Sequence, residues 1–434
     1  MIRKKNESMK KLINSVKMLM PSKQIRRGLK NTSYLTIGYF LSMVINLFGF
    51  VYIARVLGPN IYGIYLTVGA FVGLFVILTF NGIHKVILRE GAKDLNQMGD
   101  YFEKIIGIKI LFTFIAINVC IIFSLAMPYT FLEKFYIIVF SSTLIYRSLH
   151  DFFGTVYQAA EKMQYNAVLT VINRILFVSL AIAFLYMGFG LISLFIISIF
   201  SQFFTLLVNI RLTKRFVSFK IFNKIKWDKS ILIPGLIFTI LSFSVFLSSR
   251  IDLVMISLLG STKDVGIYGA AHHILEMGFI ARNILATAFF PIFIKSFYKK
   301  SVRWNKLLKY AIMLGLSMLL LAVIGSYFSE QVITLLFGVK YSQSGVLLSV
   351  LIFSLAIAFF TIPFTTTLQA THNEIINLKI CWIAPSVNIV LNYLFFNIFG
   401  LMGIAYSTLV VGVVTMPIWV FVTWRVLKIQ NRLI

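Results

Sequence analysis

Long apolar segments recur along almost the whole chain, and they constrain its fold more than any other feature. Of the 434 residues, 59% are hydrophobic and only 13% are charged, against about 25% charged residues in soluble domains. A helix that crosses a membrane needs about 20 mostly apolar residues. We predict twelve spans of that kind, at 33–56, 62–82, 105–127, 135–158, 166–187, 190–212, 232–258, 265–293, 307–328, 346–369, 376–397 and 401–424.

Backbone hydrogen bonding decides what these spans are. Because lipid offers no hydrogen-bond partner, a spanning segment must be a helix or part of a closed barrel. The alternating pattern of a membrane barrel is absent from the sequence. The predicted fold class is therefore an all-α integral membrane protein with twelve transmembrane helices.

Two turns in the sequence echo one another and suggest an internal duplication. Residues 56–65 read VLGPNIYGIY and residues 258–268 read LLGSTKDVGIY, and each turn follows the first predicted span of a group of six. Six spans in each half keep the two halves in the same orientation, as in parallel repeats that bind substrate at their interface. We therefore predict two six-helix lobes related by a pseudo-two-fold axis around a central cavity.

This organisation gives five segments. They are a basic cytoplasmic segment 1–32 containing an amphipathic helix on the membrane surface, a first lobe 33–212 with spans 1–6, a basic cytoplasmic linker 213–231, a second lobe 232–424 with spans 7–12, and a cytoplasmic tail 425–434.

The distribution of positive charge predicts the orientation. The net charge is +27, from 41 lysines and arginines against 14 acidic residues. Most of the basic residues lie in segments that share one side of the membrane when both termini are inside, which is the positive-inside pattern. We expect a multi-pass protein of the cell (plasma) membrane with both termini cytoplasmic and with basic segments against anionic headgroups. This placement argues against binding of nucleic acid.

Four arginines lie too deep in predicted spans to reach an interface easily: Arg147, Arg174, Arg250 and Arg282. A charge at the centre of a bilayer costs about 2.5–3.5 kcal/mol on the insertion scale, so such groups face a partner or a wet cavity. The planar guanidinium suits phosphate oxygens. One hypothesis is that these arginines bind an anionic headgroup such as a diphosphate. The alternative is that they form salt bridges between helices.

Three carboxylates in the spans, Asp151, Asp252 and Glu276, could provide those salt bridges or couple transport to a proton or sodium gradient. Arg250 and Asp252 are two positions apart and point to nearly opposite sides of a helix, so each needs a partner elsewhere. Arg147 lies one turn before Asp151, so these two can pair on one helix face.

Two further positions in the spans carry expectations. His272 lies one turn before Glu276, a spacing that allows a contact on one face. Lys109 is close enough to the end of its span for its amine to extend to the membrane interface.

Signatures of several enzyme classes are missing. The sequence has no GxxxxGK[ST] loop, no HExxH and no cysteine–histidine cluster, and its two cysteines, Cys120 and Cys381, lie in separate spans. We predict no cofactor, no metal and no catalytic residue. A membrane-embedded polysaccharide polymerase or glycosyltransferase remains a less favoured alternative.

The segment YIARVLGPNIYGIYLTVGAF resembles the polysaccharide flippases of the multidrug/oligosaccharidyl-lipid/polysaccharide exporter superfamily, which act in O-antigen and capsule synthesis. The first outward turn of that family reads Ala-Arg-x-Leu-Gly-Pro-x-x-Tyr-Gly. The matching residues here are Ala54, Arg55, Leu57, Gly58, Pro59, Tyr62 and Gly63. RIDLVMISLLGSTKDVGIYGAA, LLFGVKYSQSGVLLSVL and VNIVLNYLFFNIFGLMGIAYST are similar to later segments of the family.

The resemblance implies a transporter rather than an enzyme. Members of that family move a polyprenyl-diphosphate-linked oligosaccharide from the inner to the outer leaflet by alternating access, for surface polysaccharide (lipopolysaccharide or exopolysaccharide) synthesis, and polysaccharide polymerase machinery is an expected partner. Multidrug antiporters of the superfamily often carry an aspartate in the first helix, whereas residues 33–56 contain no acidic residue. Peptidoglycan-precursor flippases usually have fourteen spans, so both are weaker alternatives.

Overall fold

The computed structural model describes residues 23–91, 94–95, 98–219, 227–298, 304–370 and 374–432, and these ranges contain helices and turns but no strand. The helices of the first half are α2 (Lys23–Leu74), η1 (Phe75–Thr79), α3 (Ile83–Gly91), α4 (Met98–Ala126), α5 (Phe131–Ser141), α6 (Thr143–Ala159), α7 (Gln164–Tyr186) and α8 (Leu191–Thr213). The second half contains α9 (Lys229–Leu259), α10 (Thr262–Tyr298), α11 (Trp304–Tyr327), α12 (Ser329–Phe337), η3 (Val339–Tyr341), α13 (Ser342–Leu351), α14 (Phe353–Phe360), α15 (Ile362–Ala370), α16 (Glu374–Phe399) and α17 (Leu401–Arg432).

Within these ranges, nine helical segments are long and apolar enough to cross a membrane. One of them, Thr36–Thr79, has 44 residues and contains most of two predicted spans, 33–56 and 62–82. The predicted spans at 135–158 and 265–293 fall on α5–α6 and α10, which are not among the nine. The multi-pass helical architecture agrees with the prediction, and the count of twelve stays a prediction.

Three of the five predicted segments include residues that the structure does not describe. These are residues 1–22, with the predicted amphipathic helix, residues 220–226 of the linker and residues 433–434 of the tail. α17 continues without a break from 424 to Arg432, so the predicted tail begins inside a helix. The division into lobes at 33–212 and 232–424 remains a prediction.

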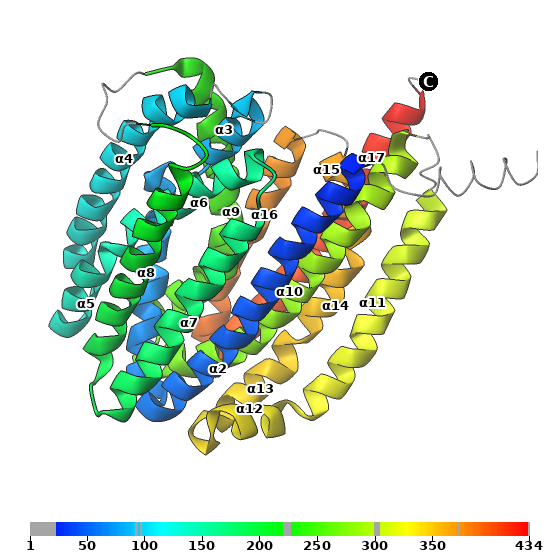
Figure 1. Cartoon of the computed structure of the whole chain (residues 1–434). Helices are drawn as coiled ribbons and strands as arrows, with labels where there is room; N and C mark the ends of the chain where they lie inside the picture. The colour runs from blue at the N-terminus through cyan, green and yellow to red at the C-terminus, as the bar shows by residue number, and fades with distance from the viewer. Residues whose placement is uncertain are drawn as a thin grey trace, which may run out of the picture.

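The helices run side by side, with the start of α2 and the C-terminus at one end and α12 at the other (Figure 1). α2 packs most extensively against α10 and α7, and α16 packs against α9 and α17. α2 therefore links the first half of the chain to the second.

The first echoed turn is a sharp bend within α2. Gly58 adopts φ 72° and ψ 168°, a conformation essentially restricted to glycine, and Pro59 follows at the start of the next helical segment, where its fixed φ suits the first turn. The second echoed turn instead begins with a capping box, in which the Ser261 amide donates to Asp264 Oδ2 at 2.9 Å and the Asp264 amide donates to Ser261 Oγ at 3.2 Å.

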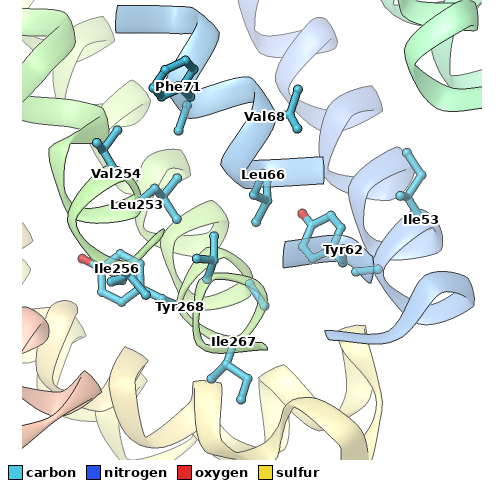
Figure 2. Packing of buried hydrophobic residues seen from close by; sticks show 14 of the residues in the cluster. Ile53, Tyr62, Leu66, Val68, Phe71, Leu253, Val254, Ile256, Ile267 and Tyr268 are labelled. Atoms are coloured by element: carbon cyan, nitrogen blue, oxygen red, sulfur yellow. The ribbon is translucent and has the colours of Figure 1, made fainter. Parts of the chain in front are cut away.

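The two echoed turns press against each other through glycines. A Cβ atom added at Gly63 would lie 1.7 Å from the carbonyl oxygen of Thr262, and one added at Gly266 would lie 2.0 Å from that of Pro59. The contact is reciprocal, as expected for two repeats that meet across a two-fold axis. Buried apolar side chains from both turns, including Tyr62 and Ile267, surround it (Figure 2).

Hydrogen bonds reinforce the same end of the molecule. Arg55 Nε donates to the carbonyl oxygen of Leu336 at 2.6 Å, its Nη2 donates to that of Leu335, and Tyr341 Oη donates to that of Ala54 at 2.9 Å. Because the C-terminal carbonyls of α12 carry partial negative charge, they suit a guanidinium. The two halves are therefore joined at the predicted outward end.

Candidate functional site

A cavity of about 510 Å³ lies among α2, α5, α6, α7, α8, α9 and α10, so helices from both predicted lobes line it. Its wall is mostly polar or aromatic. The ionisable residues that line it are Arg147, His150, Asp151, Arg174, Arg250, His273 and Glu276, together with the tyrosines Tyr39, Tyr65 and Tyr146. Three guanidinium groups against two carboxylates make the site basic.

The structure brings three of the four predicted arginines into this cavity. Arg147 comes from α6, Arg174 from α7 and Arg250 from α9. Arg282 does not line it. Its Nε donates to the carbonyl oxygen of Ala358 at 3.0 Å, and its Nη1 donates to Asn283 Oδ1 at 3.1 Å. The expectation that all four arginines share one cavity is therefore wrong for Arg282. Its guanidinium is bound instead to the carbonyl oxygen of Ala358 on α14, which also accepts from Thr361 Oγ1 at 2.9 Å.

Within the described ranges, the charged residues of the first half that line the cavity have no ionic or hydrogen-bond partner. Among the described residues, neither Arg147 nor Arg174 donates to a carboxylate or a carbonyl, and Asp151 accepts no hydrogen bond. The spacing of Arg147 and Asp151 does put both on the cavity side of α6. The pair that this spacing allows does not form. Residues on one helix face can adopt rotamers that keep their charged groups apart.

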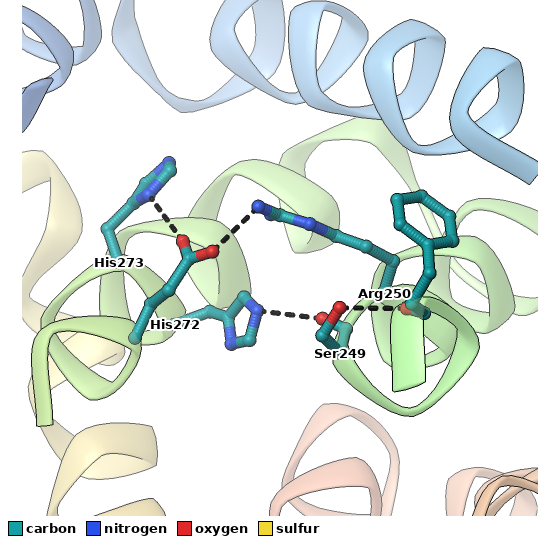
Figure 3. Close-up of polar contacts among 6 residues, drawn as sticks. Ser249, Arg250, His272 and His273 are labelled. Atoms are coloured by element: carbon teal, nitrogen blue, oxygen red, sulfur yellow. Dashed lines mark hydrogen bonds and ion pairs between the residues drawn. The ribbon is translucent and has the colours of Figure 1, made fainter. Parts of the chain in front are cut away.

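Arg250 is paired with Glu276. Its Nη2 lies 2.8 Å from Glu276 Oε1, and His273 Nδ1 lies 3.6 Å from Glu276 Oε2. Figure 3 shows Arg250 and His273 converging on this carboxylate from α9 and α10. The side chains of Arg250 and Glu276 are 27% and 34% exposed, so the pair is also open to the cavity.

The expected contact between His272 and Glu276 is wrong. His272 Nε2 instead lies 3.1 Å from the carbonyl oxygen of Ser249 on α9 (Figure 3). α10 turns its next residue, His273, toward the carboxylate, because the i,i+3 side of a helix is as close as the i,i+4 side.

Asp252 lies outside the cavity, in a polar network buried between α9, α10, α16 and α17. Its Oδ1 accepts from the amides of Asn388 and Asn392, each at 2.9 Å. Its Oδ2 accepts from Tyr268 Oη at 2.7 Å and Thr408 Oγ1 at 3.0 Å. The prediction that Arg250 and Asp252 need separate partners is confirmed.

Lys109 does not extend to an interface. Its side chain is fully buried, and Nζ donates to the carbonyl oxygens of Thr79 at 3.3 Å and Phe80 at 3.4 Å and to Asn81 Oδ1 at 3.3 Å. These carbonyls end η1, where the chain leaves the helix, so the amine satisfies groups that a helix C-terminus leaves free. The prediction of a snorkelling lysine is wrong for that reason.

Sequence reasoning missed the neutral polar groups of the cavity. Asn166, Thr170, Asn173 and Arg174 fall at i, i+4, i+7 and i+8 and lie on the cavity face of α7. Hydroxyl and amide groups of α8 face the same space, at Ser198, Ser201 and Gln202. The sequence does carry a signal for them, because these polar residues stand at helical spacing within an apolar span.

The described residues hold no cluster of three or more histidine, cysteine or acidic side chains placed to bind a metal. The side chains that line the cavity can form ion pairs and hydrogen bonds. Guanidinium groups, amides and hydroxyls around a wet space can bind an anion with attached polar groups.

Comparison with solved structures shows the fold. An inward-facing conformation of a multidrug resistance MATE family transporter of the MOP superfamily aligns with a TM-score of 0.72 at 14% identity, over 90% of this chain and 96% of that chain. The lipid II flippase MurJ in an inward closed conformation aligns with a TM-score of 0.68 at 15% identity, over 90% of this chain and 87% of that one. The all-α multi-pass membrane fold is thus confirmed.

Sequence comparison gives the family. The capsular polysaccharide biosynthesis protein CapF of Staphylococcus aureus is 26% identical over 164 residues, and the match spans 37% of this chain and 41% of CapF. The model of the family described as polysaccharide biosynthesis protein matches residues 28–297, which include every ionisable residue that lines the cavity. More than half of the sequence therefore fits that model, and the chain belongs to the polysaccharide biosynthesis protein family.

Proposed function

We propose that this protein moves a polyprenyl-diphosphate-linked oligosaccharide from the inner to the outer leaflet of the cell membrane. The observation that carries the proposal is the pair of guanidinium groups, Arg147 and Arg174, which line the cavity without a partner among the residues that the structure describes. Leaving a charge unpaired inside a membrane costs several kcal/mol. A diphosphate in the cavity would offset that cost through bidentate, charge-assisted hydrogen bonds.

The balance of charge separates this function from export of cationic drugs. With three arginines against two carboxylates, one of them already bound to Arg250, the cavity repels a cation and attracts an anion. Membership in a polysaccharide biosynthesis family supports a sugar-bearing substrate. A multidrug antiporter is therefore the weaker candidate.

Alternating access requires the closed end to open. The contact between Gly63 and Gly266, together with the hydrogen bonds of Arg55, closes the end that we predict to be outward. In the proposed cycle the headgroup enters from the inner leaflet, the two turns separate, and the headgroup leaves outward while the lipid tail stays in the bilayer.

The carboxylates have different parts in this proposal. Glu276 balances the charge of Arg250. Asp151, which faces the cavity, and Asp252, which lies in the buried network of the second half, are the candidates for coupling to a proton or sodium gradient.

The test uses vesicles reconstituted with the purified protein and a fluorescent polyprenyl-diphosphate-linked sugar. Transfer of the probe between leaflets, with no change in glycan length, is the expected result, and vesicles without protein give the background rate. A lengthening glycan would instead indicate a polymerase. A probe that stays in one leaflet unchanged would leave the protein as a scaffold of the polysaccharide assembly and would refute transport.

A further inference from the structure

Three amide side chains on three different helices line the cavity with an unused acceptor. They are Asn46 on α2, Asn166 on α7 and Gln202 on α8. The side-chain oxygen of each is buried and accepts no hydrogen bond within the described structure. Asn166 is only 8% exposed, so water does not easily take the place of a missing partner. Buried polar groups without partners are rare in proteins and need an explanation.

The side-chain hydrogen bond of Gln202 leaves one of its polar atoms without a partner among the described residues. Gln202 Nε2 donates to Ser198 Oγ at 2.8 Å, one turn earlier in α8, and this bond leaves its oxygen free. Exchanging the oxygen and nitrogen of the amide would leave the NH₂ group free instead. Asn173 Nδ2 likewise donates to Thr205 Oγ1 at 3.1 Å. In either orientation, Gln202 retains one polar atom for a ligand.

The amides form a face with its own chemistry. Asn166, Thr170 and Ser201 carry no charge, and the only ionisable residue that α7 and α8 contribute to the cavity is Arg174. A diphosphate can only accept hydrogen bonds, so it cannot satisfy the unused acceptor oxygens of Asn46, Asn166 and Gln202. Uncharged sugars carry both hydroxyl donors and acceptors, and three tyrosines in the same wall offer flat apolar surface with a polar tip.

We propose that Asn46, Asn166 and Gln202 belong to a subsite for an uncharged sugar that begins at the depth of the phosphates and extends along the cavity. This inference rests on the proposed function and adds the place where the glycan is recognised. Asn166 precedes Arg174 by eight positions on one face of α7, which is about 12 Å along the helix axis. Gly38 and Gly49 of α2 pack against Ala167 and Val178 of α7, and Asn173 of α7 bonds to Thr205 of α8, so Asn46 and Gln202 lie near the depth of Arg174. The sugar subsite therefore extends along the cavity from the depth of Arg174 to that of Asn166.

The test separates recognition of the sugar from recognition of the phosphates. Asn166→Leu and Gln202→Met remove the amide at nearly constant volume, and Asn118→Leu, at an exposed position of α4, is the matched control. Binding is measured with two probes: the lipid-linked oligosaccharide purified from the cells that encode this chain, and unsubstituted polyprenyl diphosphate of the same chain length. Arg174→Gln is measured with both probes.

Each amide variant should weaken binding of the sugar-bearing lipid about fivefold to tenfold, the effect of one or two lost hydrogen bonds, and should change binding of polyprenyl diphosphate less than twofold. Arg174→Gln should weaken binding of both probes. The subsite would be overturned if Asn166→Leu and Gln202→Met each weakened binding of the two probes equally, or if they weakened binding of neither probe. An Arg174→Gln variant that binds both probes normally would refute the proposed headgroup site and leave the sugar subsite standing. Gln202 is on a different helix from Asn166, so Gln202→Met still tests the subsite if Asn166→Leu does not fold.

Discussion

The two halves of the chain differ in how they satisfy the charged residues predicted for the site. In the first half, Arg147, Asp151 and Arg174 line the cavity and have no partner among the described residues. The charged candidates of the second half all have one. Arg250 is bound to Glu276, Asp252 to four neutral donors, and Arg282 to a backbone carbonyl. The halves share a sequence echo at their first turns but not this electrostatic arrangement.

The difference indicates that the two sets of charges have different roles, ligand binding in the first half and structural pairing in the second. A charge that the protein already satisfies adds to the packing of its own half and is costly to disturb. A charge that the protein leaves unsatisfied is available to a ligand. Substitutions of Arg147, Asp151 or Arg174 should therefore impair transport with little loss of stability, and substitutions of the paired charges of the second half should lower stability first.

The largest effect is expected at Arg174. Replacing it with Gln keeps a hydrogen-bond donor but removes the charge, and each charge-assisted bond to phosphate is worth about 1.5–3 kcal/mol. Transport of a lipid-linked sugar should fall about tenfold to 100-fold, and Arg147→Gln should act in the same direction. The measurement is the initial rate of leaflet exchange in vesicles, at equal amounts of protein.

Arg282→Gln is the matched comparison, because the same substitution there removes a guanidinium that lies outside the cavity. It should leave the affinity for the probe unchanged. If Arg174→Gln and Arg282→Gln weaken binding of the probe equally, then a position in the cavity wall does not determine which arginine binds the headgroup. The proposed contrast between the halves would then be wrong.

The next effect concerns the contact between the two echoed turns, to which both halves contribute in the same way. Gly63→Ala and Gly266→Ala each put a methyl group within about 2 Å of a backbone oxygen of the other turn, so the turns must separate. Overpacking of this kind costs about 1–3 kcal/mol, enough to shift the populations of the closed and open ends by fivefold to 150-fold. Both variants should shift the equilibrium in the same direction, because the contact is reciprocal.

This shift can be followed by the rate at which an impermeant thiol reagent labels a cysteine placed at Thr170, with Cys120 and Cys381 replaced by alanine. Gly69→Ala is the control, since a Cβ atom there meets nothing within 4 Å. Faster labelling from the predicted outward side is expected for both glycine variants. Unchanged labelling in both would show that the glycine contact does not close the cavity.

A smaller effect, on stability, is expected at Asp252. Asp252→Asn replaces one acceptor oxygen with an NH₂ group that faces hydroxyl or amide donors at 2.7–3.0 Å. A buried group left without its partner costs about 1–3 kcal/mol, so the thermal unfolding midpoint in detergent should fall. If Asp252 also couples transport to an ion gradient, the variant will lose the dependence of the exchange rate on that gradient. An unchanged midpoint would contradict the structural part of this prediction.

The comparison also shows what the sequence could and could not predict. Apolar length and backbone hydrogen bonding predict membrane helices without knowledge of contacts, and helical geometry alone separates Arg250 from Asp252. The hydrogen-bond partners of the buried charges could not be predicted in this way. Nothing local joins Asp252 to Asn388 and Asn392, whose amides come from a helix more than 120 positions later. Lys109 bonds to carbonyls that become free only because η1 ends where it does. Such contacts depend on how distant helices pack, and hydropathy does not carry that information.

The smallest effect is expected for the pair of Arg250 and Glu276, where the comparison between the halves is sharpest. The two side chains are about one-quarter to one-third exposed, so solvent screening lowers the coupling to about 0.5–1.5 kcal/mol, above the value of a surface pair and below that of a buried one. Arg250→Gln and Glu276→Gln should each lower the unfolding midpoint, and the double variant should lower it by less than the sum of the two. Asp151→Asn is the control, since its carboxylate has no partner to lose among the described residues. Additive single effects would mean that Arg250, like Arg174, is held for a ligand, and that the second half does not satisfy its own charges.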